Sequence, residues 1–187
     1  FIEFHVTDKE VLINIKKVTL SQHKIAVRTR NPKHKTGYRL QIGSKEIFND
    51  LTNLGFTPAK SLELKFPNVP EEVFGDFVRG YFDGDGCIYF KQHFRKDRNR
   101  LEWFMTSRFT CGNKRFLEIL HAKLGNFTHK GFIYKKQRSG YELVFSRKDS
   151  LALFHLMYNN IGHGLFLTRK YVKFKKAIKT LYGNLRA

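Results

Sequence analysis

Apolar and polar residues alternate in several stretches of the chain, and elsewhere apolar residues recur with helical spacing. Alternation predicts strands over residues 1–6, 23–31 and 37–43. A helix beginning at Thr7 or Asp8 follows the first strand, and a helix beginning at Ser44 follows the third. The inner faces predicted for these two helices are Val11, Leu12, Ile15 and Val18, and then Ile47, Phe48, Leu51 and Leu54.

A similar order returns later in the chain. A helix over about 70–85 is followed by strands over 87–95 and 101–111, and a helix capped by Asn113 leads to strands over 127–136 and 140–146. Two more helices follow, near 148–159 and 168–176. Short matches such as Gly37-Tyr38-Arg39-Leu40 with Gly140-Tyr141-Glu142-Leu143 indicate an internal duplication. We therefore expect an α+β protein with an incomplete first half over 1–66 and a second half over 67–187.

Charge narrows the range of functions. Lys and Arg number 35 against 16 acidic residues, so the net charge is +19 and the pI about 10.1. Such an excess favours a polyanionic partner. Hydrophobic residues make up 41% of the chain, which is enough for a core and argues against disorder.

No apolar run approaches the length of a membrane helix, residues 1–5 do not resemble a signal peptide, and Cys87 and Cys111 are too few for a disulfide scaffold. An intracellular nucleic-acid-binding protein is expected, in the cytoplasm, the nucleoid or an organelle matrix.

The run Gly80-Tyr81-Phe82-Asp83-Gly84-Asp85-Gly86 is the sharpest feature of the sequence. Asp-x-Asp-Gly also opens calcium loops, but counting from Asp83, Ile88 and Phe94 stand where such a loop needs Gly and Glu. Paired metal-binding aspartates of glycosyltransferases are another alternative, but they do not need so basic a chain. A plain helix terminus in a Gly-rich turn is the simplest alternative. Apolar and small residues crowd this helix, so we expect it to be buried and to deliver carboxylates to an interface.

Residues 78–86 (Val-Arg-Gly-Tyr-Phe-Asp-Gly-Asp-Gly) resemble the LAGLIDADG signature of homing endonucleases, and the order of elements after them is similar too. The resemblance implies a LAGLIDADG homing-endonuclease fold of two αββαββα-type units with antiparallel DNA-binding sheets, the first unit incomplete. It also implies a sequence-specific endonuclease for double-stranded DNA, dependent on Mg²⁺ or another divalent metal and encoded in an intron or intein.

Residue roles follow from the same resemblance. Asp85 would bind metal at the scissile phosphates, the Gly84 carbonyl would join the coordination, and Asp83 would support the helix end. Gly80 would be the contact point between two motif helices. Arg169 or Lys170 would lie beside the scissile phosphate, and Lys170 is the residue assigned as catalytic.

Only one such motif is present, so the second motif helix is expected from a truncated upstream segment or from a second chain. Cleavage by this chain alone therefore stays open. Two other readings also stay open: a binding-only relative, such as an RNA-splicing maturase or a DNA-binding regulator, and an unrelated basic RNA-binding module.

Strand alternation also assigns a polar face that long donor side chains could present to base edges. An ordinary solvated strand face is the alternative. The strand residues assigned to DNA are Lys24, Arg28, Arg30, Arg39, Gln41, Tyr89, Lys91, His93, Arg95, Thr106 and Arg108. Turn and loop cations expected to contact phosphates include Arg98, Arg100, Lys135, Lys136 and Arg138.

Overall fold

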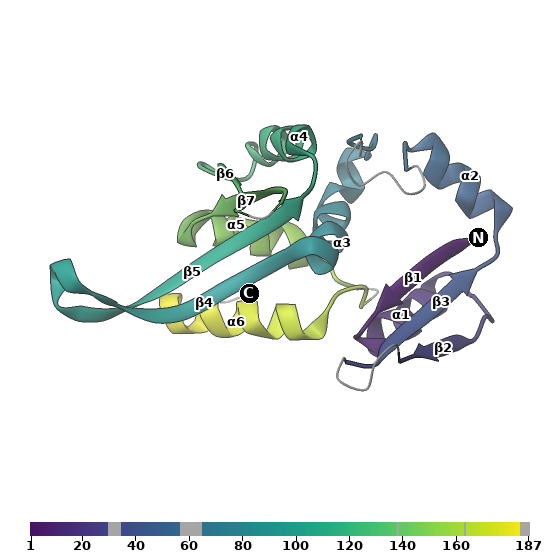
Figure 1. Ribbon diagram of the computed structural model, residues 1–187, viewed down its shortest axis with the longest axis horizontal. Coiled ribbons are helices and arrows are strands. Elements are labelled where there is room, and N and C mark those ends of the chain that lie inside the picture. Colours follow the sequence, from purple (N-terminus) through teal and green to yellow (C-terminus); the bar gives the residue numbers. More distant parts are fainter. Residues whose placement is uncertain (30–34, 57–64, 138, 163, 184–187) are drawn as a thin grey trace. The chain divides into compact units, whose positions relative to one another are not determined.

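The computed structural model describes residues 1–29, 35–56, 65–137, 139–162 and 164–183. The chain divides into two compact units (Figure 1). Unit 1 comprises Phe1–Thr57 with Ile161–Leu167, and unit 2 comprises Pro58–Asn160 with Thr168–Ala187. Each unit pairs helices with one antiparallel sheet, so the predicted α+β class is confirmed.

Unit 1 consists of β1 (Ile2–Val6), α1 (Lys9–Val18), β2 (Ile25–Arg28), β3 (Gly37–Ile42) and α2 (Lys45–Asn53). Its sheet has the order β1–β3–β2, with both pairs antiparallel. Alternation along the strands points apolar side chains toward α1. The core of unit 1 is formed by Leu12, Leu40 and Ile42, with Phe4, Val6, Ile15, Ile25 and Tyr38 packed against it.

The start of α2 agrees with the prediction, but its packing does not. Ser44 Oγ accepts a hydrogen bond from the Ile47 amide at 3.1 Å, as expected of an N-cap. No residue of α2 is buried, however, and Phe48 is 39% exposed. Val18, also expected to face inward, is 47% exposed, and Val27, on the core side of β2, is 65% exposed. Periodicity located the apolar side of each element, but it carries no information on whether another element covers that side.

Unit 2 begins with a 3₁₀ turn (Glu71–Val73) and then α3 (Phe74–Asp85), β4 (Gly86–Arg95) and β5 (Arg100–Cys111). The chain continues through α4 (Lys114–Leu124), β6 (Phe132–Lys135), β7 (Tyr141–Phe145), α5 (Arg147–Tyr158) and α6 (Thr168–Tyr182). The sheet order is β4–β5–β7–β6. Its last three strands, with α4 between β5 and β6, repeat the order that β1, α1, β2 and β3 show in unit 1.

One face of the unit 2 sheet is apolar and covered by helices. The fully or nearly buried side chains on that face are Ile88, Phe90, Met105, Phe109, Leu143 and Phe145. Asn113 caps α4 by accepting hydrogen bonds from the amides of Arg115 and Phe116. The apolar residues that helical spacing places on one side of α4 are all buried: Phe116, Leu117, Leu120 and Leu124. The faces predicted for β4 and β5 are therefore confirmed.

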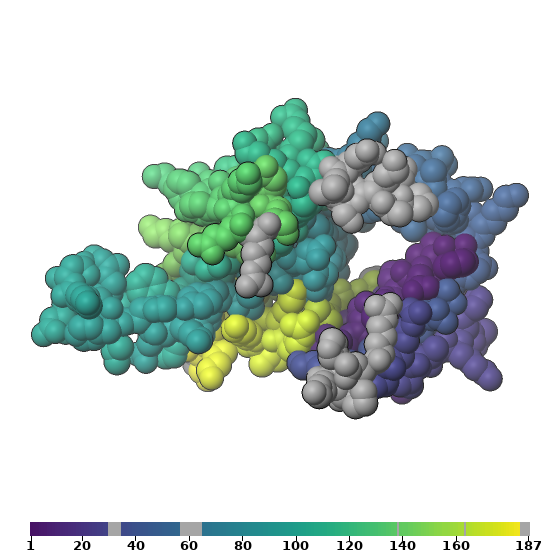
Figure 2. Space-filling view, viewed as in Figure 1, coloured from purple at the N-terminus to yellow at the C-terminus, as the bar shows by residue number. Residues whose placement is uncertain are grey.

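The long β4–β5 hairpin projects beyond the helices of unit 2 (Figure 1). Phe90 and Trp103 stack across its strands with centroids 4.4 Å apart. The turn closes through Asn99, whose φ of 49° lies in the left-handed region that Asn tolerates. In the space-filling view the β4–β5 hairpin, coloured teal, forms a separate lobe (Figure 2). The polar face of this hairpin is therefore accessible along most of its length.

Candidate nucleic-acid interface and motif-helix end

Helix α3 is held in unit 2 by aromatic packing and two side-chain bonds. Phe82 is fully buried and packs edge-to-face on Phe109 at 5.5 Å. Tyr81 donates its hydroxyl to the Thr110 carbonyl at 2.7 Å, and burial raises the pKa of that hydroxyl. The buried Arg79 donates to the Met157 carbonyl at 2.7 Å and pairs with Asp76. The helix that carries the acidic motif is therefore fixed from its middle to its end.

The sequence predicted that α3 would end in the run Asp83–Gly86, and the structure shows that both acids belong to its last turn. Gly86 follows in an extended conformation and starts β4 directly, with no intervening loop. A Cβ at Gly86 would lie 2.6 Å from the Phe82 carbonyl oxygen, so only glycine fits this joint without a shift. The joint places Asp85 four residues before Tyr89, the first residue of β4 that the sequence predicted to face DNA.

The predicted motif residues lie on different sides of α3. Asp85 is exposed, whereas Asp83 is half-buried. Gly80 and Gly84 are both exposed, and a Cβ at either would meet no heavy atom within 4 Å. Since residues four apart share one face of a helix, Gly80 and Gly84 form an open, shallow strip that leads to Asp85.

Lys170 lies at the same helix end, in a place that sequence reasoning did not foresee. Its side chain comes from the first turn of α6 and is only 7% exposed. The Nζ atom donates to the carbonyls of Phe82, Asp83 and Gly86 at 2.6, 2.9 and 2.6 Å. Burial lowers the pKa of Lys170, and the Asp83 carboxylate opposes that shift. A catalytic contact with phosphate stays a prediction, and it would require one of these bonds to be given up.

Four predicted residues of the hairpin meet on the polar face of the sheet. Tyr89 and Thr106 are cross-strand partners, and the Tyr89 hydroxyl is hydrogen-bonded to His93 Nε2 at 2.5 Å. The Arg108 guanidinium lies over the Tyr89 ring, 5.4 Å from its centroid. Lys91 is exposed on the same face.

Acidic residues between the cations are the feature that sequence reasoning missed. Glu142 on β7 pairs with Arg108 and with Lys136, each at 3.5 Å. The sequence could have predicted the position of Glu142, because alternation along Tyr141-Glu142-Leu143 puts this residue on the polar face. Lys135, on the neighbouring strand β6, is exposed.

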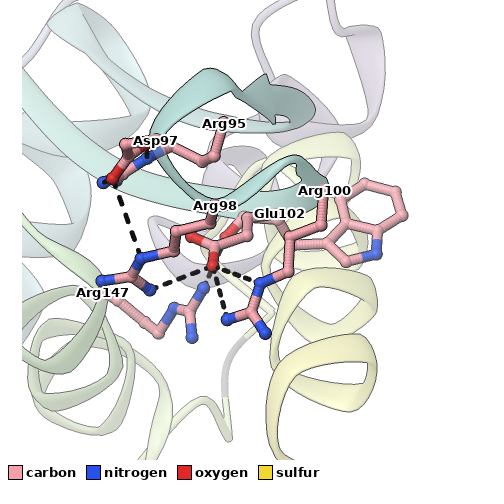
Figure 3. A network of polar contacts seen from close by, with 7 residues as sticks. Arg95, Asp97, Arg98, Arg100, Glu102 and Arg147 are labelled. Carbon is pink, nitrogen blue, oxygen red and sulfur yellow. Dashed lines mark hydrogen bonds and ion pairs between the residues drawn. The ribbon is translucent and has the colours of Figure 1, made fainter.

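Another acid organises the hairpin tip (Figure 3). Glu102 Oε1 accepts hydrogen bonds from Arg98 at 3.0 Å and from Arg100 Nη2 at 2.7 Å. Asp97 accepts two bonds from Arg95, at 2.8 and 2.6 Å. The hydrogen bonds from Arg100 and Arg95 lower the pKa values of Glu102 and Asp97, respectively. The tip arginines are thus held in an ordered array and still expose their outer edges.

The predicted residues of unit 1 form a separate group. By register, Arg28, Arg39 and Gln41 share one face of the sheet, opposite the core. Gln41 donates to Glu3 at 2.7 Å, and Arg39 lies 3.8 Å from the same carboxylate. Lys24 is exposed just before β2. Arg30 and Arg138 lie outside the described residues.

The described part of the chain lacks two other kinds of site. None of its helices is long and apolar enough to cross a membrane. Across the same residues, no three or more His, Cys, Asp and Glu side chains gather closely enough to form a metal site by themselves. Any cation at Asp85 would therefore need further ligands from elsewhere.

Comparison with known proteins gives a consistent picture. Residues 73–157 match the model of the LAGLIDADG-like domain family. The fold resembles meganuclease I-SmaMI bound to uncleaveable DNA, with a TM-score of 0.63, 13% identity, and coverage of 95% of this chain and 77% of that chain. I-SmaMI bound to an uncleaved DNA target with calcium ions gives a TM-score of 0.61 at 13% identity, covering 95% and 78%.

A curated relative is a probable translation initiation factor IF-2 of Methanocaldococcus jannaschii. It is 29% identical over 140 residues, which cover 71% of this chain. The chain spans only 11% of the length of that relative.

The two antiparallel sheets and the helix that ends in acids at the start of a hairpin define an α+β fold of the meganuclease type. Residues 73–157 match the LAGLIDADG-like domain family, and the homing-endonuclease fold expected from the motif is confirmed.

Proposed function

We propose that the chain is part of a site-specific endonuclease that hydrolyses phosphodiester bonds of double-stranded DNA with Mg²⁺ or a similar cation. The observation that carries this proposal is the position of Asp85, an exposed carboxylate at the end of a rigidly packed helix. The polar face of the hairpin begins at Tyr89, four residues later, so a duplex lying on that face would bring its phosphates close to Asp85.

DNA binding is supported by the charge pattern and by the relatives of known structure. The cations at the tip and on the polar face are held by acids, which limits their freedom before binding and reduces the entropy lost on contact. Arginine can bond guanine edges bidentately in the major groove, and a two-stranded ribbon fits that groove. Lys135, Lys136 and Arg98 would contact phosphates and make the affinity dependent on salt.

The residues at the helix end suit a divalent cation with oxygen ligands. Mg²⁺ commonly binds through one or two carboxylates plus substrate phosphates and retains several waters, so a complete protein cage is not needed. Asp85 and the Gly84 carbonyl would hold the cation. When bound, it would polarise the phosphate and lower the pKa of a water molecule for in-line attack.

A second motif helix would supply the second acid. The open strip at Gly80 and Gly84 supports this part of the proposal, because glycines allow two helix backbones to approach closely. The partner helix would come from an upstream segment of the same polypeptide or from a second chain.

We also propose that the host gene carries this domain as an intein rather than as an intron product. The supporting observation is that the matching segment is a small part of a translation factor. Sequencing the coding region on both sides of the segment tests this. A continuous reading frame into an unrelated host protein supports the intein, and a free-standing frame within an intron contradicts it.

Cleavage of a randomised duplex library with Mg²⁺ tests the proposed activity. The wild-type protein should make short-overhang breaks at one sequence, and Asp85→Asn should abolish them while leaving DNA binding intact. Asp50→Asn, which removes an exposed acid of α2, is the matched control and should cut normally. Binding without any cutting, even with a second motif helix supplied, would instead support a maturase or a DNA-binding regulator.

A further inference from the structure

The extended conformation that follows α3 limits the backbone donors that reach the carbonyl groups at its end. A helix leaves its last carbonyls without intrahelical donors, and a left-handed residue after the helix usually satisfies them. Gly86 is extended instead, with φ −94° and ψ 166°, because the chain enters β4 at once. Its amide donates to the Phe82 carbonyl.

Lys170 adds side-chain donors to this helix end. An ammonium group has three donors and no acceptor, and the three donors of Lys170 go to Phe82, Asp83 and Gly86. The Phe82 ring lies under the same Nζ atom, 5.2 Å from it. A cation is also favourable at the negative end of the helix dipole. Two of the accepting carbonyls, those of Asp83 and Gly86, lie on either side of Gly84 and Asp85.

We propose that Lys170 is a positioning residue, whose three bonds fix the last turn of α3 and hold Gly84 and Asp85 in the geometry that binds a divalent cation. This rests on the proposed function, because it assigns Lys170 a role only through the metal-holding residues. Groups behind the direct ligands of a metal typically change its affinity or the activity by about 10–100-fold when they are removed.

Electrostatics alone predicts the opposite change in metal affinity when Lys170 is removed, and this difference makes the proposal testable. A positive charge beside a cation site repels the cation, so a merely electrostatic Lys170 would weaken metal binding and its removal would strengthen it. A positioning Lys170 gives the reverse result, since loss of the three bonds releases the turn that carries Asp85. A phosphate-contacting lysine would leave metal binding by the free protein unchanged.

The experiment titrates the full chain with Mn²⁺ and follows paramagnetic broadening of the Asp85 and Cys87 amide signals. Lys170→Met should raise the Mn²⁺ concentration for half-maximal broadening about 10-fold. Two controls should leave it unchanged. Lys176→Met removes an exposed charge from the same helix, and Phe174→Leu weakens the packing of α6 on Phe82 without touching the carbonyls. An unchanged or lowered Mn²⁺ concentration with Lys170→Met overturns the proposal.

The wild-type titration separates this proposal from the proposed function. If Asp85→Asn abolishes the broadening and Lys170→Met does not alter it, the positioning role alone is overturned. Wild-type broadening that survives Asp85→Asn overturns the metal site and the positioning role with it. If Lys170→Met does not fold, Lys170→Gln retains two donors and should give a smaller rise, and no rise would refute the proposal.

Discussion

Replacing Gly86 with alanine perturbs the joint between α3 and β4 and tests whether its geometry matters. The added Cβ would lie 2.6 Å from the Phe82 carbonyl oxygen, about 0.8 Å inside the 3.4 Å at which ordinary contact begins. The opposing atom belongs to the backbone, so it cannot rotate away as a side chain would. The last turn of α3 and the first residue of β4 must therefore separate by a substantial fraction of an ångström.

Two effects of different size follow from this shift. Overpacking of this kind costs about 1–3 kcal/mol of folding stability, which in a domain of this size lowers Tm by roughly 2–4 °C per kcal/mol. The functional effect should be larger. A displacement near 1 Å at a reacting group can reduce the rate on the order of 10²-fold, and Asp85 is the immediate neighbour of the substituted residue.

Gly80→Ala provides the matched comparison, because a Cβ there meets nothing within 4 Å in the described chain. It should raise the stability of the isolated chain by up to about 1 kcal/mol, the helix preference of Ala over Gly. Chemical denaturation and single-turnover cleavage under saturating Mg²⁺ measure the two quantities for both variants. Equal denaturation midpoints and equal cleavage rates for Gly86→Ala and the wild type would refute the argument from the joint.

Three further outcomes are expected. Arg79→Met should destabilise the chain by about 1–3 kcal/mol in urea unfolding, because the Met157 carbonyl loses its buried donor; an unchanged midpoint would show that water replaces the guanidinium. The Glu102 carboxyl should titrate below its ordinary pKa of 4.5, since hydrogen bonds from Arg100 and Arg98 favour its charged form. Its contribution to order at the tip should be fully present above pH 4.5 and lost as the pH falls through the lowered value, which side-chain NMR can follow. Glu142→Gln frees Arg108 and Lys136 from their shared acid and should steepen the salt dependence of DNA binding, whereas an identical slope would indicate that neither cation contacts DNA.

Local patterns in the sequence were sufficient for most of the fold. The Asn113 and Ser44 caps, the inner face of α4 and the two faces of the β4–β5 hairpin all depend on residues within a few positions of one another. The acidic run was equally visible, because its residues are consecutive. Short segments of the chain determine these features, so periodicity and capping rules are enough to predict them.

The features that were missed depend on distant residues. Lys170 meets its three carbonyl partners across 84 to 88 positions of sequence, and an isolated lysine in a basic helix gives no sign that it is buried. Arg79 likewise finds Met157 from 78 positions away. The same difficulty applies to α2, whose amphipathic pattern was read correctly and whose packing was not. Local rules identify which side of a helix is apolar, but tertiary topology decides what covers it.

The length of the β4–β5 hairpin limits how many base pairs of DNA one domain could contact. Strand β4 runs for 10 residues from Gly86 to Arg95, and a rise of about 3.3 Å per residue makes it roughly 33 Å long. One full turn of B-form DNA measures about 34–36 Å. Because the groove winds around the axis, a ribbon of this reach would sample at most about ten consecutive base pairs. An added or deleted pair of strand residues at the tip should therefore lengthen or shorten the recognised site rather than alter the place of cutting.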